Sequence, residues 1–185
     1  MTHPSKDPYQ SAEFEVGRVH GCRTSFPGRQ LMKSLPYREG SWFAIPLRHG
    51  GYTRGAVARM APGGRIVLAY LFGPKRDAAP VLVDAERLQP KDAVRRLRIG
   101  DLGLINGDWS VLGELPNWDR HAWSMPLFIR RDDLSKRAWR SIYSDVDPSK
   151  LEREEPVSYE TGELERDVLH GAGAVELLLT KLLCS

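Results

Sequence analysis

The chain has 185 residues, enough to bury about two-thirds of its unfolded surface in one domain. A formal net charge of +3 and a calculated pI near 8.9 are mildly basic and do not by themselves indicate a nucleic-acid-binding protein. Two cysteines, Cys22 and Cys184, exclude a disulfide-rich fold and are typical of a reducing compartment. No apolar run is long enough to span a membrane and the N-terminus has no signal-peptide pattern, so we expect a soluble, cytoplasmic protein.

The N-terminal residues 1–36 contain four prolines and few periodic apolar positions. Such a segment buries too little apolar surface to offset the entropy of ordering it. We therefore expect residues 1–36 to form a flexible or loosely attached extension, and residues 37–185 to form a single β-rich domain.

Three short apolar runs follow, at Ser41–Leu47, Tyr52–Met60 and Ile66–Phe72. The first two alternate with the period of two that a strand needs to cover a core, and the third is apolar on both faces. Glycine pairs separate the runs, at 50–51 and 63–64, as tight hairpin turns require. The pattern predicts a strongly curved antiparallel sheet or a small SH3-like barrel, with these side chains buried: Phe43, Ile45, Val57 and Leu68.

Weaker patterns fill the middle of the chain. Residues 84–88 are typical of one helical turn, and Ala93–Ile99 of a strand, with a short helix as the alternative. Asn106-Gly107 is a turn signal between apolar residues, which favours a hairpin. Further strands are predicted at Trp123–Ile129 and Ala138–Ser144.

The C-terminal segment Ala172–Leu183 has apolar residues at helical spacing. So short a helix is marginal in isolation, so its leucine face must dock on the sheet. The predicted stripe consists of Val175, Leu178, Leu179, Leu182 and Leu183. The fold class is therefore mainly β (α+β), with a C-terminal amphipathic helix packed on the sheet.

No catalytic motif is present: the sequence lacks a nucleophile elbow, a phosphate-binding loop and a zinc-protease pair. His121 lies beside Asp119, but a structural role is the commoner one for such a histidine. Asp132 and Asp133 are adjacent, so on a strand they would point to opposite faces. We expect no enzyme activity, no catalytic residue, no metal and no cofactor.

Charge is unevenly distributed. Residues 145–167 carry nine acidic residues against three basic ones, whereas residues 1–60 carry nine basic against four acidic. We expect this acidic segment to be a long irregular excursion with one short strand near Val157. A cluster of positive charge is formed by Arg95, Arg96 and Arg98. It could contact phosphates or form a solvated strand face. Of the five tryptophans, most are expected in the core, and Trp118 is the best candidate for exposure because it lies in a Pro/Asn/Asp loop.

Several ordered blocks of sequence, covering roughly residues 37–183, resemble the immunity protein 26 family, whose members are antidotes encoded in bacterial polymorphic toxin loci. Ser110 and Ser124 stand where the resemblance leads us to expect proline, and residues 1–36 lie outside it. The blocks are GSWFAIPL (40–47), GYTRGAVARM (51–60), AYLFGP (69–74), GDLGLINGDWSVLGELPNWDR (100–120), WSMPLF (123–128) and GAGAVELLLTKLL (171–183).

The resemblance implies a mostly β protein that binds and blocks a cognate toxin, encoded by a neighbouring gene, without catalysis. Toxins that act on nucleic acid are usually basic at their clefts, so an acidic patch could occupy them and speed association. The candidate toxin-binding residues are Asp145, Asp147, Glu152, Glu154, Glu155, Glu160 and Trp118. The alternative is a nucleic-acid-binding small β-barrel, which only the arginine cluster and the basic pI support.

Overall fold

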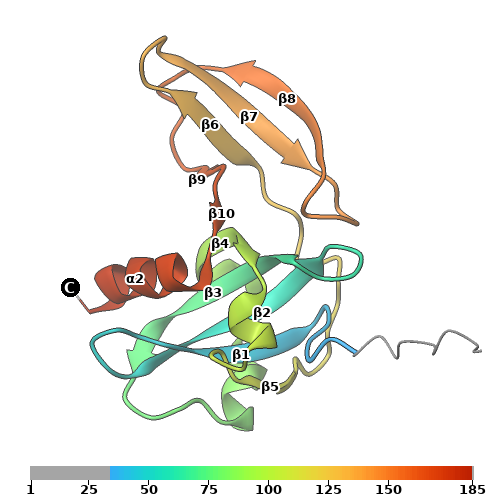
Figure 1. Ribbon diagram of the computed structural model, residues 1–185, viewed down its shortest axis with the longest axis vertical. Coiled ribbons are helices and arrows are strands. Elements are labelled where there is room, and N and C mark those ends of the chain that lie inside the picture. Colours follow the sequence, from blue (N-terminus) through green and yellow to red (C-terminus); the bar gives the residue numbers. More distant parts are fainter. Residues whose placement is uncertain (1–33, 185) are drawn as a thin grey trace, which may run out of the picture. The chain divides into compact units, whose positions relative to one another are not determined.

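The computed structural model describes residues 34–184, except for the side chains of residues 82, 83 and 87. This part of the chain contains two β-sheets, a C-terminal helix and short helical turns (Figure 1). The expected flexible extension falls mainly on residues 1–33, outside the described residues. Its boundary with a single domain over 37–185 stays a prediction.

The first sheet contains the predicted meander. Its strand order is β10-β4-β3-β2-β1-β5, and all its neighbours are antiparallel except β10 and β4. The strands are β1 (Ser41–Pro46), β2 (Tyr52–Met60), β3 (Ile66–Arg76), β4 (Ala93–Gly100), β5 (Val111–Glu114) and β10 (Leu169–His170). The strands predicted at 41–47, 52–60, 66–72 and 93–99 are thus confirmed.

One contact shows why β1 and β2 pair as they do. Phe43 lies opposite Gly55, and a Cβ at Gly55 would come within 2.4 Å of the Phe43 ring. The ring in turn stacks on Trp109, with centroids 5.6 Å apart and planes 2° from parallel. The four side chains predicted to be buried, Phe43, Ile45, Val57 and Leu68, are all 0% exposed.

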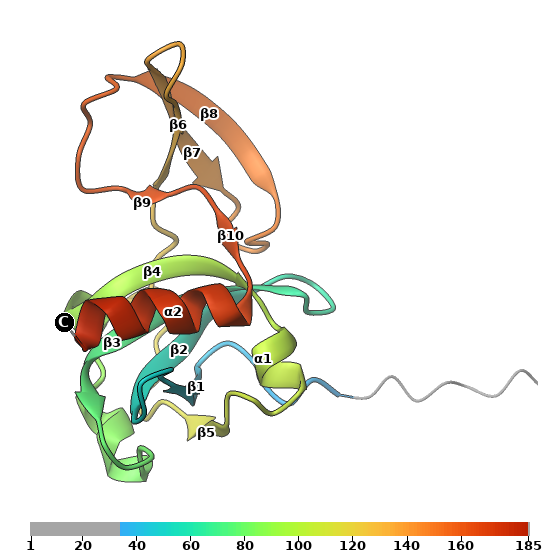
Figure 2. The same cartoon turned by 60° about the vertical axis from the view of Figure 1, so that its left-hand side comes forward.

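Both faces of the first sheet are covered. Helix α2 (Ala172–Leu183) lies over one face (Figure 2). Its Val175 and Leu179 side chains are buried in the core cluster there. On the other face, a second apolar cluster forms around Trp42 and Trp123, beneath the 3-10 helix η1 (Leu82–Arg87). Three of the five tryptophans, including Trp109, are fully or almost fully buried, as expected for core residues.

The predicted helix is confirmed, but its stripe is narrower than expected. Leu182 is 41% exposed, whereas Thr180 is buried. The Thr180 hydroxyl donates to the Glu176 carbonyl and accepts the Arg48 N–H at 3.0 Å, so this polar side chain is satisfied where it is buried. The helix therefore docks through Val175 and Leu179 more than through its last turn.

The hairpin expected around Asn106-Gly107 is wrong on its first side. Residues Leu102–Ile105 form one helical turn, α1, not a strand. The Asp101 carbonyl accepts the N–H groups of Leu104 and Ile105, and the Gly103 carbonyl accepts that of Trp109 at 2.8 Å. The turn itself is present, since Gly107 has φ +80°. Local hydrogen bonds outweigh the strand pattern here.

The strand expected at Trp123–Ile129 is also displaced. It begins only at Phe128, as β6 (Phe128–Asp132), because Pro126 has no N–H to donate to a ladder. The helical turn expected near residues 84–88 is found as η1, and a second 3-10 turn, η2 (Pro90–Asp92), follows it.

The second sheet has the order β8-β7-β6-β9 and contains β7 (Arg137–Tyr143), β8 (Leu151–Val157) and β9 (Glu165–Arg166). The strand expected near Val157 is present as β8, but it is longer than expected, because seven residues form a regular edge strand within the segment expected to be an irregular excursion. An edge strand with one exposed pairing side accommodates charged side chains. The sequence of β8 therefore lacks the alternating apolar pattern by which a strand is predicted. Neither sheet closes into a barrel, and strong curvature of the first sheet stays a prediction.

Candidate functional site

The tight connection between β7 and β8, residues 144–150, is the centre of the candidate site and is called the β7–β8 turn below. The Asp147 carboxylate accepts hydrogen bonds from the Ser149 N–H at 2.9 Å and from its hydroxyl at 2.6 Å. Both contacts lower the pKa of Asp147. The Ser144 N–H donates to the Lys150 carbonyl across the base of the turn at 3.0 Å. The sequence Asp-Pro-Ser thus fixes a local turn by its own side chains.

Two buried arginines of the first sheet hold this turn from both ends. Arg59 of β2, 2% exposed, donates from Nε to Asp145 at 2.9 Å. Arg98 of β4, 7% exposed, donates from Nε to the Pro148 carbonyl at 2.8 Å. The turn is therefore preorganised by contacts that come from the other sheet.

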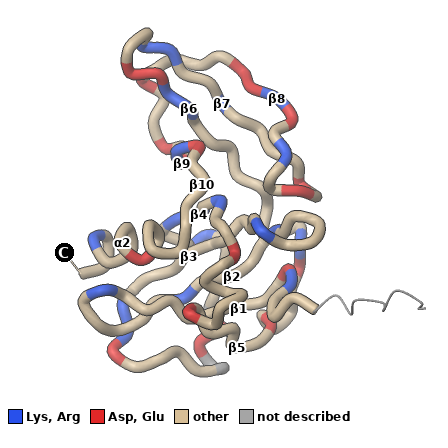
Figure 3. The backbone as a smooth tube through the Cα atoms, viewed as in Figure 1, with Lys and Arg blue, Asp and Glu red and all other residues tan. Residues whose placement is uncertain are grey.

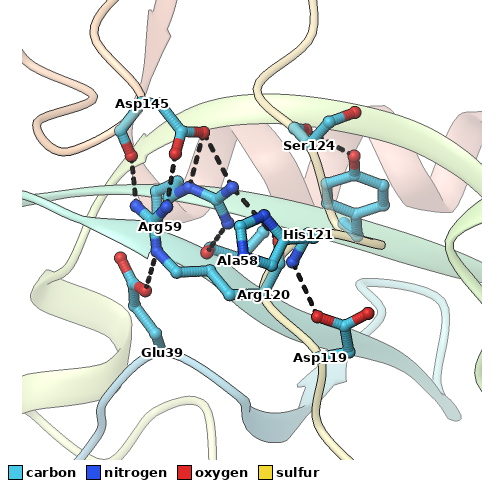
Figure 4. Close-up of polar contacts among 9 residues, drawn as sticks. Glu39, Ala58, Arg59, Asp119, Arg120, His121, Ser124 and Asp145 are labelled. Atoms are coloured by element: carbon cyan, nitrogen blue, oxygen red, sulfur yellow. Dashed lines mark hydrogen bonds and ion pairs between the residues drawn. The ribbon is translucent and has the colours of Figure 1, made fainter.

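Asp145 also belongs to a wider charged network (Figure 4). Arg120 pairs with both the carboxylate and the carbonyl of Asp145, and its Nε donates to Glu39 at 2.8 Å. Burial acts to raise the pKa of the Asp145 carboxyl, but the hydrogen bonds and charges of Arg59 and Arg120 outweigh it and lower that pKa. The network joins four segments distant in sequence: the approach to β1, β2, the loop after β5 and the β7–β8 turn.

Apolar and acidic side chains are exposed in the turn and at the start of β8, where Asp147 is half-buried. Val146 is 70% exposed and Leu151, at the start of β8, is 42% exposed. Glu152 is exposed and its side chain has no partner within residues 34–184. We call Val146, Asp147, Leu151 and Glu152 the turn patch.

Other acidic residues of this segment are neutralised within the protein. Glu154 accepts two hydrogen bonds from Arg130, at 2.7 and 3.0 Å. Glu155 pairs with Arg140 of the neighbouring strand and with Arg153. These contacts lower the pKa of both carboxyls. Figure 3 shows the result as blue and red stretches that alternate through the second sheet.

The remaining candidates lie apart from the turn patch or beside it. Glu160 is exposed beyond the far end of β8. Trp118 is half-buried, not exposed as expected, and packs on Trp123 with ring centroids 5.4 Å apart. It lies in the same loop as Arg120, which connects it to the Asp145 network.

His121 does not assemble a catalytic pair. Its backbone N–H, not its ring, contacts Asp119, at 3.0 Å, and its side chain is exposed. Asp132 caps the β6–β7 turn through Ser135, whereas Asp133 accepts from Tyr159. Within the described residues, no group of three or more His, Cys, Asp or Glu side chains is placed to hold a metal ion.

The arginine cluster on β4 is engaged inside the protein. Arg95 pairs with Glu165 at 3.5 Å and Arg98 pairs with Asp167 at 2.8 Å. Arg96 lies over the Tyr70 ring, 5.4 Å from its centroid. A nucleic-acid-binding protein would need these arginines to contact phosphates, whereas here they contact carboxylates and an aromatic ring of the same chain.

Sequence reasoning gave no role to Arg59 or Arg120, and it expected Arg98 to contact phosphates or solvent, whereas all three fix the candidate site. One available signal is that Arg59 lies in a strand whose neighbours are apolar, where a charge needs a partner. None of the described helices has the length and apolar character needed to cross a bilayer.

The described residues form a small, mainly β protein whose β7–β8 turn is held by arginines of the first sheet. The family model of immunity protein 26 matches residues 38–154, which is more than half of the chain. The chain therefore belongs to the immunity protein 26 family, as its sequence blocks indicated. Searches of curated proteins and of solved structures found no match.

Proposed function

We propose that this protein is an immunity protein that binds a cognate bacterial toxin in the cytoplasm and neutralises it by contact, without catalysis. Membership of the immunity protein 26 family supports the general role. The toxin is the product of a neighbouring gene in this proposal.

The observation that carries the choice of surface is the rigid presentation of the turn patch. Arg59 and Arg98 hold the β7–β8 turn, so Val146 is already exposed in a fixed turn. The turn therefore does not have to become ordered when a partner binds. A preorganised loop loses less conformational entropy when a partner docks. An exposed valine beside carboxylates supplies an apolar contact with a polar rim, as protein interfaces do.

Carboxylates without an arginine partner and carboxylates paired with arginines have different roles in this proposal. Asp147 and Glu152 provide the negative field that steers a basic partner. Asp145, Glu154 and Glu155 already face arginines, so they add less to that field and serve as hydrogen-bond acceptors at the rim. In this proposal the contact extends from the turn patch toward Trp118 on one side and toward Glu160 on the other.

The test is co-expression with the toxin encoded beside this protein, scored as growth rescue, together with association and dissociation rates of the purified pair. Glu152→Lys is the informative charge reversal, because its side chain has no partner to lose within the described residues. It should slow association about tenfold at low salt, and the defect should shrink as salt screens the attraction. Val146→Ser should instead speed dissociation.

Glu163→Lys is the matched control, since it makes the same charge change at an exposed residue beyond β8. Equal rescue and equal rates for Glu152→Lys, Val146→Ser and Glu163→Lys would exclude the turn patch. A wild-type protein that binds no neighbouring toxin, yet binds RNA or DNA tightly and in a salt-sensitive way, would refute the proposed function itself.

A further inference from the structure

A pocket of about 520 Å³ opens between the loop that carries Trp118 and the segment that joins η1 to η2. One wall contains Trp118 and Trp123, whose rings are tilted by 40°. The opposite wall contains Leu88 and Pro90. This pocket is called the indole pocket below.

The indole ring of Trp118 is held in place. A Cβ added to Gly40, which has φ +85°, would come within 2.8 Å of that ring, so the glycine lets the backbone approach it closely. The Gly40 carbonyl also accepts the Leu115 N–H at 2.8 Å, fixing the start of the loop. Asn117 takes a left-handed φ of 53° just before the tryptophan. The aromatic wall is thus built into the fold.

The charged side chains that line the indole pocket, among those the structure describes, are the carboxylates Glu86 and Asp119. Asp119 uses Oδ1 for the His121 N–H, which leaves Oδ2 available. Glu86 is exposed and its side chain has no described partner. Arg120, adjacent in sequence, leaves the loop in another direction, toward Asp145 and Glu39 (Figure 4), so it does not neutralise the pocket.

We propose that the indole pocket receives an arginine side chain of the protein partner. A guanidinium is attracted by the face of an indole and donates hydrogen bonds to carboxylates, and this pocket supplies both. It is continuous with the candidate surface, because Arg120 of the same loop pairs with Asp145 at the base of the β7–β8 turn. The identity of the partner as a toxin rests on the proposed function, but binding of the cation does not.

The first experiment needs no toxin. The full chain is titrated with N-acetyl-arginine amide while the indole N–H signals are followed by NMR. We expect saturable shifts of the Trp118 and Trp123 signals with millimolar affinity, and none with the neutral isostere N-acetyl-citrulline amide. The double variant Glu86→Gln and Asp119→Asn should weaken binding about tenfold, because charge-assisted hydrogen bonds are lost. The amide oxygen that Asp119→Asn introduces can still accept the His121 N–H, so the loop should keep its fold.

Asp108→Asn is the control, since Asp108 is exposed and lies outside the pocket lining. Absence of saturable shifts, or equal shifts with the citrulline compound, would refute arginine binding in the indole pocket. This holds even if the wild-type protein rescues growth. If the arginine compound binds, but the double variant rescues growth and binds the toxin as well as wild type, then the partner's arginine does not use this pocket. If an arginine of the toxin enters the pocket, the double variant must bind the toxin more weakly than the wild-type protein does.

Discussion

The guanidinium carbon of Arg98 lies 3.5 Å from the centre of the Tyr143 ring. Arg98 belongs to β4 of the first sheet and Tyr143 to β7 of the second, so this stacking fastens one sheet to the other. Asp167 completes the contact: it pairs with Arg98 at 2.8 Å and accepts from the Tyr143 hydroxyl at 2.9 Å. Burial and this hydrogen bond raise the pKa of Tyr143 to about 12, so it stays protonated and keeps donating.

Replacing Asp167 tests this junction. Its side chain and that of Arg98 are each only 8% exposed. Asp167→Asn would leave the arginine buried without its counter-charge, which should cost about 3 kcal/mol in the free energy of unfolding, measured with urea. Glu163→Gln, which changes an exposed carboxylate, should leave the unfolding midpoint unchanged. Equal midpoints for both variants would show that the junction contributes little.

A comparison of two leucines of α2 distinguishes the stability that comes from docking of the helix from the stability that comes from helix propensity. Leu179 is 0% exposed and Leu182 is 41% exposed. Leu179→Ala should therefore lower the free energy of unfolding by about 2–5 kcal/mol, because it opens a cavity in the core. Leu182→Ala should change it by less than about 1 kcal/mol, since surface substitutions are nearly neutral. Similar melting temperatures for the two variants would contradict the docking described for this helix.

The turn after α1 depends on a glycine. Gly107 has φ +80° and no atom within 4 Å of an added Cβ, so strain there comes from the backbone alone. Gly107→Val should destabilise the protein by about 1 kcal/mol or more in thermal or urea unfolding. Gly162→Val is the matched control, because that position is also open and has no left-handed φ. A larger loss at Gly162 than at Gly107 would refute the assignment.

Stability should fall in acid, partly through the β7–β8 turn. The pKa of Asp145 is lowered in the folded protein, net of the opposing effect of burial, by Arg59 and Arg120. The stabilisation is therefore complete above the unfolded pKa near 4 and is lost as pH falls through the lower, folded value. Asp145→Asn should be less stable than wild type at pH 7, and the difference should shrink from about pH 5 to pH 3.

The measurement is urea unfolding at a series of pH values. Glu152→Gln serves as the control, because this carboxylate lies close in sequence but has no described partner. Its stability should follow that of wild type at every pH. A constant difference between wild type and Asp145→Asn down to pH 3 would mean that ionisation of Asp145 is not what stabilises the turn.

Local rules sufficed for much of the fold. Alternation and paired glycines predicted β1, β2 and β3, because a strand that covers a core must repeat every two residues and its turns need positive φ. Helical spacing likewise predicted α2. The same rules failed at Leu102–Ile105, where backbone hydrogen bonds to Asp101 favoured a helical turn, and at β8, whose exposed edge allows charges to replace the apolar pattern.

The sequence alone determined that this is a mainly β member of the immunity protein 26 family with an acidic segment near its C-terminal end. Only the tertiary structure decided which of those acids remain free. Arg59 lies 86 residues from Asp145, and Arg98 lies 69 residues from Asp167. A carboxylate's net charge toward a partner depends on the cations within a few ångströms of it, and sheet pairing brings those cations from distant parts of the chain. The formation of the turn patch and the indole pocket therefore follows from packing between segments, which no local pattern encodes.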